Sequence, residues 1–298
     1  MKSEEWGSCG NPANTDKWKK GVPQMIEVDV SKCKQDKICL AECPMGIIRM
    51  GQGEESYPEM VPGGEKVCLV CGHCVAVCPH GAMSHKLVPL EECPPIRKEL
   101  ALDLERAVQF LRSRRSVRVF KEQAVEREKI ERLLEIARYA PTGGNSQTVQ
   151  WTVFTGKEKL RELSATAVEW IRKLVEGGPK PGVPAYMPLI VAGWDAGKDT
   201  VLRDAPALLV ASCPKENPNG MVDLTLALSY LELAAPTMGL GTCWAGLLQR
   251  ALMFWEPLKG AVGLPEGHTN HYPMMLGYPK FRYYRLPERR PPRVTWRT

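Results

Sequence analysis

The spacing of cysteines in one short stretch constrains this chain more than any other feature. The segment CLVCGHCVAVCPHG has the pattern C-x2-C-x2-C-x3-C-P, formed by Cys68, Cys71, Cys74, Cys78 and Pro79. Three thiolates two residues apart can surround one face of a cubane iron–sulfur cluster, while the fourth reaches a second cluster. Zinc sites usually have paired C-x2-C knuckles separated by a longer loop, and disulfide frameworks suit oxidising compartments, so both alternatives are less favoured.

The same motif occurs a second time, earlier in the chain. A shift of 35 positions, the difference between Cys68 and Cys33, superimposes CKQDKICLAECPMG on the later motif. Cys33, Cys39 and Cys43 then match cysteines, but Asp36 stands where the later motif has Cys71. The chain therefore contains an internal repeat in which one of the expected ligands has been replaced.

This repeat resembles the bacterial two-cluster ferredoxins, over about residues 25 to 90. In that family the last cysteine of each motif binds the cluster of the other motif. The resemblance implies that one [4Fe-4S] cluster is bound by Cys68, Cys71, Cys74 and Cys43. It implies that a second cluster, [4Fe-4S] or [3Fe-4S], is bound by Cys33, Cys39 and Cys78.

Asp36 leaves three possibilities open for the second cluster. Its carboxylate could bind a fourth iron, it could be idle beside a three-iron cluster, or the fourth iron could be labile. An oxygen donor is harder than a thiolate, so it should bind that iron less firmly and alter its potential. Asp36 could equally be an ordinary exposed turn residue. The cysteines without motif spacing are expected to be small buried residues: Cys9, Cys93, Cys213 and Cys243.

Downstream of the repeat, the hydrophobic pattern changes to that of a larger α+β domain. Residues 91–101 are rich in proline and charge and are expected to form a linker. Apolar residues at helical spacing predict helices over 102–111, 126–139, 157–176 and 221–238, and apolar runs predict strands over 149–155 and 207–212. The expected layering is a mixed sheet with helices around it.

Two polar segments flank the second of these helices. The segment RSRRSVRVF supplies guanidinium groups and a hydroxyl that could hold a phosphate: Arg114, Arg115, Ser116 and Arg118. The segment APTGGNSQ ends the helix and offers polar groups on a tight loop: Pro141, Thr142, Asn145 and Gln147. This loop could hydrogen-bond a heteroaromatic ring, or it could simply cap its own turn.

These segments, in this order, are similar to the nitroreductase family of FMN proteins, from about residue 102 to the C-terminus. The resemblance implies a nitroreductase-like FMN fold that is an obligate homodimer, with one FMN in each of two interface sites. Arg114, Ser116 and Arg118 would bind the FMN phosphate and ribityl chain. Thr142 stands where the family often has serine, and the loop containing Pro141, Thr142, Asn145 and Gln147 would approach the flavin from the other subunit.

Two later segments extend this resemblance. LAAPTMGLGTCWAGLL resembles the segment that passes along the isoalloxazine ring, so backbone N–H groups from Thr242 through Trp244 to Gly246 would face flavin N5 and O4. GYPKFRYYRLPERRPPRV resembles the C-terminal stretch from which a basic residue reaches the FMN phosphate. Arg289 fits that role best by its distance to the end, and Arg285 is the competitor.

The charge distribution argues against nucleic acid as a partner. The formal charge is +6, and the seven basic residues from Lys280 onward, set against Glu288, account for all of it. Residues 1–279 then have 33 basic and 33 acidic side chains, which leaves no uniformly basic face for a phosphate backbone. No apolar run approaches the ~18 residues of a membrane span, and the N-terminus lacks the apolar core of a secretory signal. We therefore expect a cytoplasmic protein without membrane contact.

The four expected parts are an N-terminal extension (1–24), a two-cluster ferredoxin-like domain (25–90), a linker (91–101) and an FMN domain (102–298). Clusters carry single electrons, and a flavin can accept them singly and release two. This predicts a reductase that takes electrons from ferredoxin or another low-potential donor and reduces an electron-poor small molecule, such as a nitroaromatic. Flavin N5, with no catalytic side chain, would be the reacting atom. Alternatives are an electron-transfer module that serves a protein partner and a redox sensor, although no DNA-binding segment supports the sensor.

Overall fold

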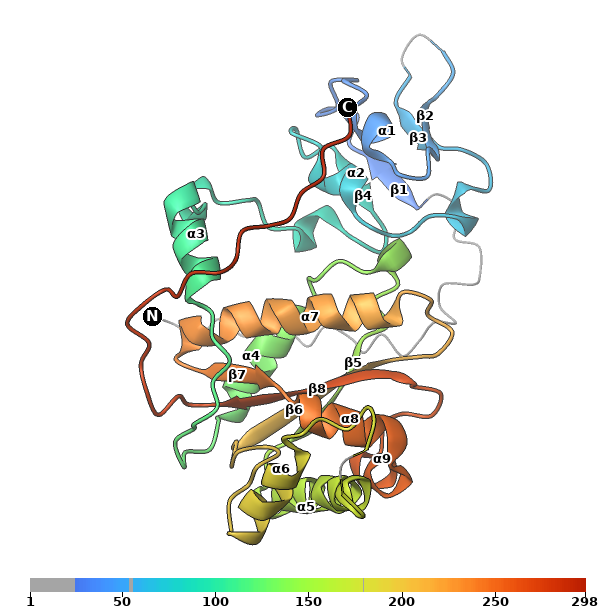
Figure 1. The fold of residues 1–298 in the computed structure, drawn as a ribbon. Coiled ribbons are helices and arrows are strands. Elements are labelled where there is room, and N and C mark those ends of the chain that lie inside the picture. The colour runs from blue at the N-terminus through green and yellow to red at the C-terminus, as the bar shows by residue number, and fades with distance from the viewer. Residues whose placement is uncertain (1–24, 54–55, 179) are drawn as a thin grey trace. The chain divides into compact units, whose positions relative to one another are not determined.

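The computed structural model describes residues 25–53, 56–178 and 180–298, and the chain divides into two compact units between Leu100 and Ala101. Each unit has its own arrangement of elements (Figure 1). Cys9 and the rest of the expected N-terminal extension lie outside the described residues.

The first unit consists of two small antiparallel sheets and two short helices. β1 (Ile26–Val28) pairs with β4 (Met83–His85), and β2 (Ile48–Met50) pairs with β3 (Pro58–Met60). The helices are α1 (Ile38–Glu42) and α2 (His73–Ala76), and 3-10 turns cover Gly64–Lys66, Leu90–Glu92 and Lys98–Leu100. Its small core includes Ile26, Ile48, Val75 and Met83, packed beside several of the motif cysteines.

The sequence repeat is also a repeat of backbone conformation. Three pairs of residues that are 35 positions apart all have positive φ: Gln35 (53°) and Val70 (52°), Lys37 (63°) and Gly72 (71°), Gly46 (60°) and Gly81 (57°). A positive φ is uncommon for residues other than glycine and is costly for a β-branched residue such as Val70. The strands β2 and β4 are related by the same shift. The two motifs therefore have the same local fold, despite the exchange of Cys71 for Asp36.

The second unit is built on a four-stranded sheet with the order β5-β6-β8-β7. Its strands are β5 (Gln150–Phe154), β6 (Ala207–Cys213), β7 (Gly241–Trp244) and β8 (Asn270–Gly277), and neighbours are antiparallel. An isolated parallel bridge joins Ser116 to Thr242 at the β7 edge. The expected α+β architecture is confirmed, whereas the sheet, expected to be mixed, has only antiparallel neighbours among its four strands.

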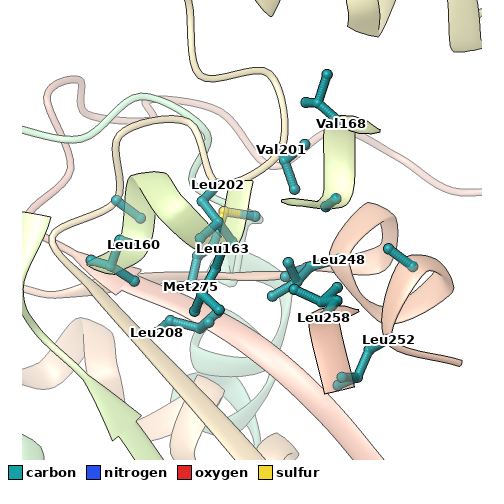
Figure 2. Close-up of a cluster of buried hydrophobic side chains, with 14 of the residues drawn as sticks. Leu160, Leu163, Val168, Val201, Leu202, Leu208, Leu248, Leu252, Leu258 and Met275 are labelled. Carbon is teal, nitrogen blue, oxygen red and sulfur yellow. The ribbon is translucent and has the colours of Figure 1, made fainter. Parts of the chain in front are cut away.

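Helices cover both faces of this sheet (Figure 1). One face carries α4 (Arg127–Ala137) and α7 (Gly220–Ala234), and the other carries α5 (Lys157–Val175), α6 (Met187–Asp195), α8 (Gly246–Phe254) and α9 (Glu256–Val262). All residues of β6 are buried, because its side chains alternate between the two cores. Leu209 packs toward α4 and α7, whereas Leu208 packs with Leu163 and Leu248 in the opposite core (Figure 2).

Helix α3 (Leu104–Ser113) differs from the others because it contains no buried residue. Asp103 caps its N-terminus, with Oδ1 accepting from the Arg106 amide at 2.8 Å. Its apolar residues Leu104, Val108 and Leu111 follow helical spacing, yet they are 81%, 42% and 56% exposed. The helix thus presents an apolar stripe that the described part of its own unit leaves uncovered.

The expected helices and strands form, with small shifts at their ends. The last expected helix, 221–238, ends at Ala234 and continues as a 3-10 turn over Ala235–Met238, where Pro236 removes a backbone donor. Hydrophobic periodicity did not predict strand β8, which contains Pro273, or helix α6, which is apolar on most sides. No helix among the described residues is long and apolar enough to cross a membrane.

Candidate cofactor sites

Seven cysteines of the first unit surround two separate hollows. The Cys68 hollow, with an empty volume of about 390 Å³, is lined by Cys43, Cys68, Cys71 and Cys74. The Cys33 hollow, of about 340 Å³, is lined by Cys33, Asp36, Cys39 and Cys78. The fold thus exchanges Cys43 and Cys78 between the motifs, which is the grouping that the ferredoxin resemblance implies. Cluster ligation by these residues stays a prediction.

The donor chemistry of both hollows suits iron–sulfur clusters. The cysteines in the described part of the chain are free thiols. No three described His, Cys, Asp or Glu side chains converge as a single metal ion would require, whereas a cluster spreads its thiolate ligands over several irons. The set of thiols around each hollow therefore fits a polynuclear cluster better than one zinc ion.

Burial makes several of these thiols less acidic than usual. The pKa of Cys74 is raised to about 11, mainly by burial and to a smaller extent by the neighbouring Cys68, Cys71 and Cys43. The pKa of Cys39 is raised for the same reason, with smaller contributions from Cys78 and Asp36. Closely spaced thiolates repel one another in a desolvated site, so they need a bound cation to hold them ionised.

Asp36 lies at the edge of the Cys33 hollow. Its Oδ1 accepts a hydrogen bond from the Ile38 amide at 3.2 Å, and its Oδ2 lies 3.6 Å from His80 Nε2. The carboxylate therefore stabilises the turn before α1 and also faces the hollow, which His80 lines as well. A turn role and a ligand role are both compatible with this position.

His85 is a residue of the first unit that the sequence analysis missed. It is 2% exposed, lines the Cys68 hollow, and its Nε2 lies 3.7 Å from Cys68 Sγ. Burial lowers its pKa, which favours the neutral ring. The signal that could have revealed it is its position in the repeat, where the earlier motif has Met50.

The basic segment of the second unit lies against β7. The Val117 amide donates to the Thr242 carbonyl at 2.8 Å, so the segment runs beside the strand. Gly241 permits this approach, because an added Cβ would collide with Val117. Arg115 Nη2 is buried and has no hydrogen-bond partner among the described residues, whereas Arg118 is exposed. An unpaired buried guanidinium nitrogen beside an exposed arginine fits an anionic ligand such as the FMN phosphate. We call Arg115, Ser116 and Arg118 the arginine cradle.

Arg114 has a different environment from the arginine cradle. Its Nη1 lies 2.9 Å from Glu232 Oε1, and the Trp244 indole donates to Glu232 Oε2 at 3.0 Å. Glu232 is 7% exposed, so this ion pair is largely shielded from water. Arg114 is therefore engaged in an ion pair with Glu232, a residue that the sequence analysis did not single out. Arg115 is the arginine that has a buried nitrogen without a hydrogen-bond partner among the described residues. The pair also fixes Trp244, which packs edge-on against Tyr272 with ring centroids 5.0 Å apart.

The loop after α4 is organised by the buried side chain of Asp223. This carboxylate, 1% exposed, accepts hydrogen bonds from the Gly143 amide at 2.9 Å, from Ser146 Oγ at 3.2 Å and from Asn217 Nδ2 at 2.9 Å. Asp223 is the second functional residue of this unit that the sequence analysis missed, because no motif marks it. It holds the loop from a distant element, α7.

Within this loop the predicted flavin-contacting residues are partly used for the turn itself. Thr142 Oγ1 accepts from the Gln147 amide at 3.1 Å. Gln147 has a φ of 48°, which strains a residue of its type, and Asn145 has a φ of 55°, which asparagine adopts more readily. Pro141 and Gln147 are exposed. Such strain at an exposed, rigidly held loop is typical of binding sites.

Downstream of β7, part of the predicted row of backbone donors is already engaged. The Ala245 amide donates to the Pro273 carbonyl at 3.0 Å, so it is not available to a flavin ring. Gly246 begins α8, and the first amides of a helix have no partner inside the helix. Thr242 is 2% exposed and Trp244 is partly buried, so the donors that could face a ligand are concentrated near Gly246.

The C-terminal segment returns to the basic segment. Tyr283 Oη donates to the Ser116 carbonyl at 3.5 Å, and Arg112 Nη2 lies 2.8 Å from Glu288 Oε2. Arg285 lies between these two anchor points in sequence, and Arg289 follows the second. Both are exposed. The structure thus anchors the tail to the basic segment on either side of Arg285.

Comparisons with known proteins agree with these features. A family model described as the nitroreductase family matches residues 111–278, and one described as a 4Fe-4S dicluster domain matches residues 31–83. The chain therefore belongs to the nitroreductase family of oxidoreductases and has a ferredoxin-type 4Fe-4S domain before that region. The predicted resemblances to these two families and the predicted fold class are confirmed.

Relatives of the second unit come from several organisms. An Archaeoglobus fulgidus protein, named provisionally as an NADH dehydrogenase/NAD(P)H nitroreductase, is 26% identical over 181 residues, which are 59% of this chain and 87% of that protein. A Bacteroides fragilis nitroreductase solved with bound FMN has a TM-score of 0.54 and 20% identity, over 63% of this chain and 96% of its own. A Desulfitobacterium hafniense nitroreductase with bound FMN has a TM-score of 0.50 and 22% identity, over 63% and 96%. These two structures show the fold alone.

Proposed function

We propose that this chain is an FMN-dependent reductase that receives electrons singly through two iron–sulfur clusters and delivers them to an electron-poor small molecule, such as a nitroaromatic. The observation that carries the proposal is that one chain has two thiol-lined hollows in one unit and the arginine cradle in the other. When bound, the clusters supply one-electron transfer and FMN supplies exchange of one or two electrons, with N5 as the reacting atom. The paired cofactors favour ferredoxin or a similar low-potential donor.

We assign the cluster ligands by the lining of each hollow. Cys43, Cys68, Cys71 and Cys74 would hold a [4Fe-4S] cluster, and Cys33, Cys39 and Cys78 would hold the second cluster. Asp36 faces the second hollow, and we propose it as the oxygen ligand of a fourth iron there. Since oxygen is a harder donor than thiolate, this iron would be the one lost most easily.

We assign the FMN phosphate to the arginine cradle. Arg115 offers a buried donor without a partner, and Ser116 and Arg118 lie beside it on the same strand-like segment. Arg114 would contribute from its ion pair with Glu232, and Arg285 or Arg289 would close the site from the tail. The loop of Pro141, Thr142, Asn145 and Gln147 and the backbone near Trp244 and Gly246 would contact the ring system.

A homodimer completes this proposal. The exposed apolar stripe of α3 (Leu104, Val108 and Leu111) has the composition of an interface core. A second copy would cover it, and the exposed, rigidly held loop around Gln147 would reach the partner's flavin. Residues 25–90 would act as the cluster domain and residues 102–298 as the FMN domain, joined by the linker 91–101.

The test compares reoxidation rates. Chemically reduced protein should be reoxidised by an electron-poor nitroarene faster than free FMN at the same concentration. Equal rates would contradict the reductase proposal. Fast reoxidation by a one-electron carrier protein, with no acceleration by any small acceptor, would instead favour an electron-transfer module.

A further inference from the structure

The imidazole of His85 is built into the wall of the Cys68 hollow. It lies at the end of β4, where it is 2% exposed, and its Nε2 lies 3.7 Å from Cys68 Sγ. Sulfur is large, so this separation is within hydrogen-bonding range. The same sulfur also accepts a hydrogen bond from the Val70 amide at 3.4 Å.

The hydrogen bond at the other ring nitrogen, Nδ1, shows which nitrogen of His85 is protonated. Nδ1 of His85 accepts a hydrogen bond from the Leu87 amide at 3.1 Å. A nitrogen that accepts cannot carry a proton, so the ring is neutral and its single N–H is at Nε2. The N–H bond is therefore the one that faces Cys68, and His85 is a hydrogen-bond donor to that sulfur.

The sequence repeat provides a built-in comparison. The shift of 35 positions places His85 on Met50, at the end of β2, and Cys68 on Cys33. A thioether has no N–H group and is only a weak acceptor. The two motifs have the same backbone geometry, but this position supplies a donor to the Cys68 hollow and none to the Cys33 hollow.

We propose that His85 raises the reduction potential of the cluster in the Cys68 hollow, and that it thereby makes the two clusters of the chain unequal. Adding one electron increases the negative charge on the cluster and its thiolates, so a hydrogen bond to a ligand sulfur stabilises the reduced state more than the oxidised state. His85 stays neutral throughout, and the step transfers one electron and no proton. This inference rests on the proposed ligation by Cys68.

The experiment is a redox titration of the full chain followed by electron paramagnetic resonance. His85→Met installs the residue of the matched position, and His85→Gln keeps an N–H group close to the place of Nε2. His85→Met should reduce the equilibrium constant for reduction of one cluster about tenfold, which is about 59 mV for a one-electron couple. His85→Gln should restore most of this shift, and the control Met50→Leu should leave both midpoints unchanged.

The outcomes separate this inference from the proposed function. A His85→Met protein that keeps both signals with native midpoints would overturn the role of His85 and leave cluster binding intact. Native protein without two cluster signals would overturn the proposed ligation itself. Should His85→Met not assemble its cluster, His85→Leu is decisive, because it also removes the Nε2–H donor and is expected to lower the midpoint of the same cluster. No change in that variant would overturn the inference.

Discussion

The two units of this chain build their candidate sites in different ways. In the first unit, short stretches with fixed cysteine spacing fold around hollows, and the second copy of the motif repeats the geometry of the first. In the second unit, the basic segment, the loop around Gln147, two buried carboxylates and the C-terminal tail come from distant parts of the sequence. The backbone conformation of the locally spaced motif is kept although Asp36 replaces a cysteine, whereas the assembled site depends on residues without any motif.

The largest effect is expected for the first unit. Cys74→Ser should remove a whole cluster, a loss of about four irons per chain, because a hydroxyl is a poorer and less acidic ligand than a thiol. FMN content should not change, since the unit that would bind it is separate. Iron analysis and the visible spectrum measure the result. Cys93→Ser is the control, because the Cys93 thiol donates to the Pro89 carbonyl and lines neither hollow; equal iron in both variants would contradict the assignment.

A substitution in the apolar stripe of α3 tests whether the second unit forms a homodimer. Leu104→Glu should weaken self-association by roughly 10- to 100-fold, since burying a leucine is worth about 1.5–3 kcal/mol. Sedimentation at several concentrations measures the dimer constant. Gln109→Glu adds the same charge elsewhere on the exposed helix and should have little effect. An unchanged constant for Leu104→Glu would mean that the stripe is no interface.

Arg115→Met tests the arginine cradle. Charge-assisted hydrogen bonds contribute about 1.5–3 kcal/mol, so FMN should bind roughly 10- to 100-fold more weakly. Riboflavin, which lacks the phosphate, should bind as it does to the native protein. Arg297→Met, at an exposed position of the tail, is the matched control. Equal weakening of FMN and riboflavin would show that Arg115 does not act through the phosphate.

Asp223→Asn tests the support of the loop. The change keeps the shape but removes the charge and an acceptor that Gly143, Ser146 and Asn217 share. The free energy of unfolding of the second unit should fall by about 1–3 kcal/mol, and FMN affinity should fall with it. Iron content should stay native. Chemical denaturation with flavin fluorescence as the probe measures both effects. An unchanged free energy of unfolding would show that Asp223 does not support the loop.

The smallest effect concerns acid stability. The Tyr278 hydroxyl donates to Glu126, which lowers the pKa of this carboxyl below its ordinary 4.5. A lowered pKa in the folded state contributes stability above the ordinary value, and this contribution is lost as the pH falls through the folded value. The melting temperature of Glu126→Gln should therefore fall slightly less than that of the native protein on acidification below 4.5. Glu128→Gln, at an exposed position in the helix that follows Glu126, should follow the native curve.

The two units also differ in how much of their structure could be predicted from the sequence. The resemblance to two-cluster ferredoxins predicted that Cys43 and Cys78 exchange between the motifs, and the lining of the two hollows groups them in this way. Glu232 and Asp223 could not be foreseen, since a single acid in a mostly apolar helix has no pattern to mark its partner. His85 could have been noticed as the exchange for Met50, but its hydrogen bond depends on the fold of β4. Strand β8 and helix α6 lack a readable period, because tertiary burial rather than amphipathicity determines their composition.

The most direct test of the account is the iron, acid-labile sulfide and FMN content of the full chain, isolated without oxygen and then offered flavin. The account predicts about one FMN with about eight irons per chain, or about seven if the iron beside Asp36 is lost. Iron without FMN would contradict the reductase proposal, and about four irons with FMN would contradict a cluster in the Cys33 hollow.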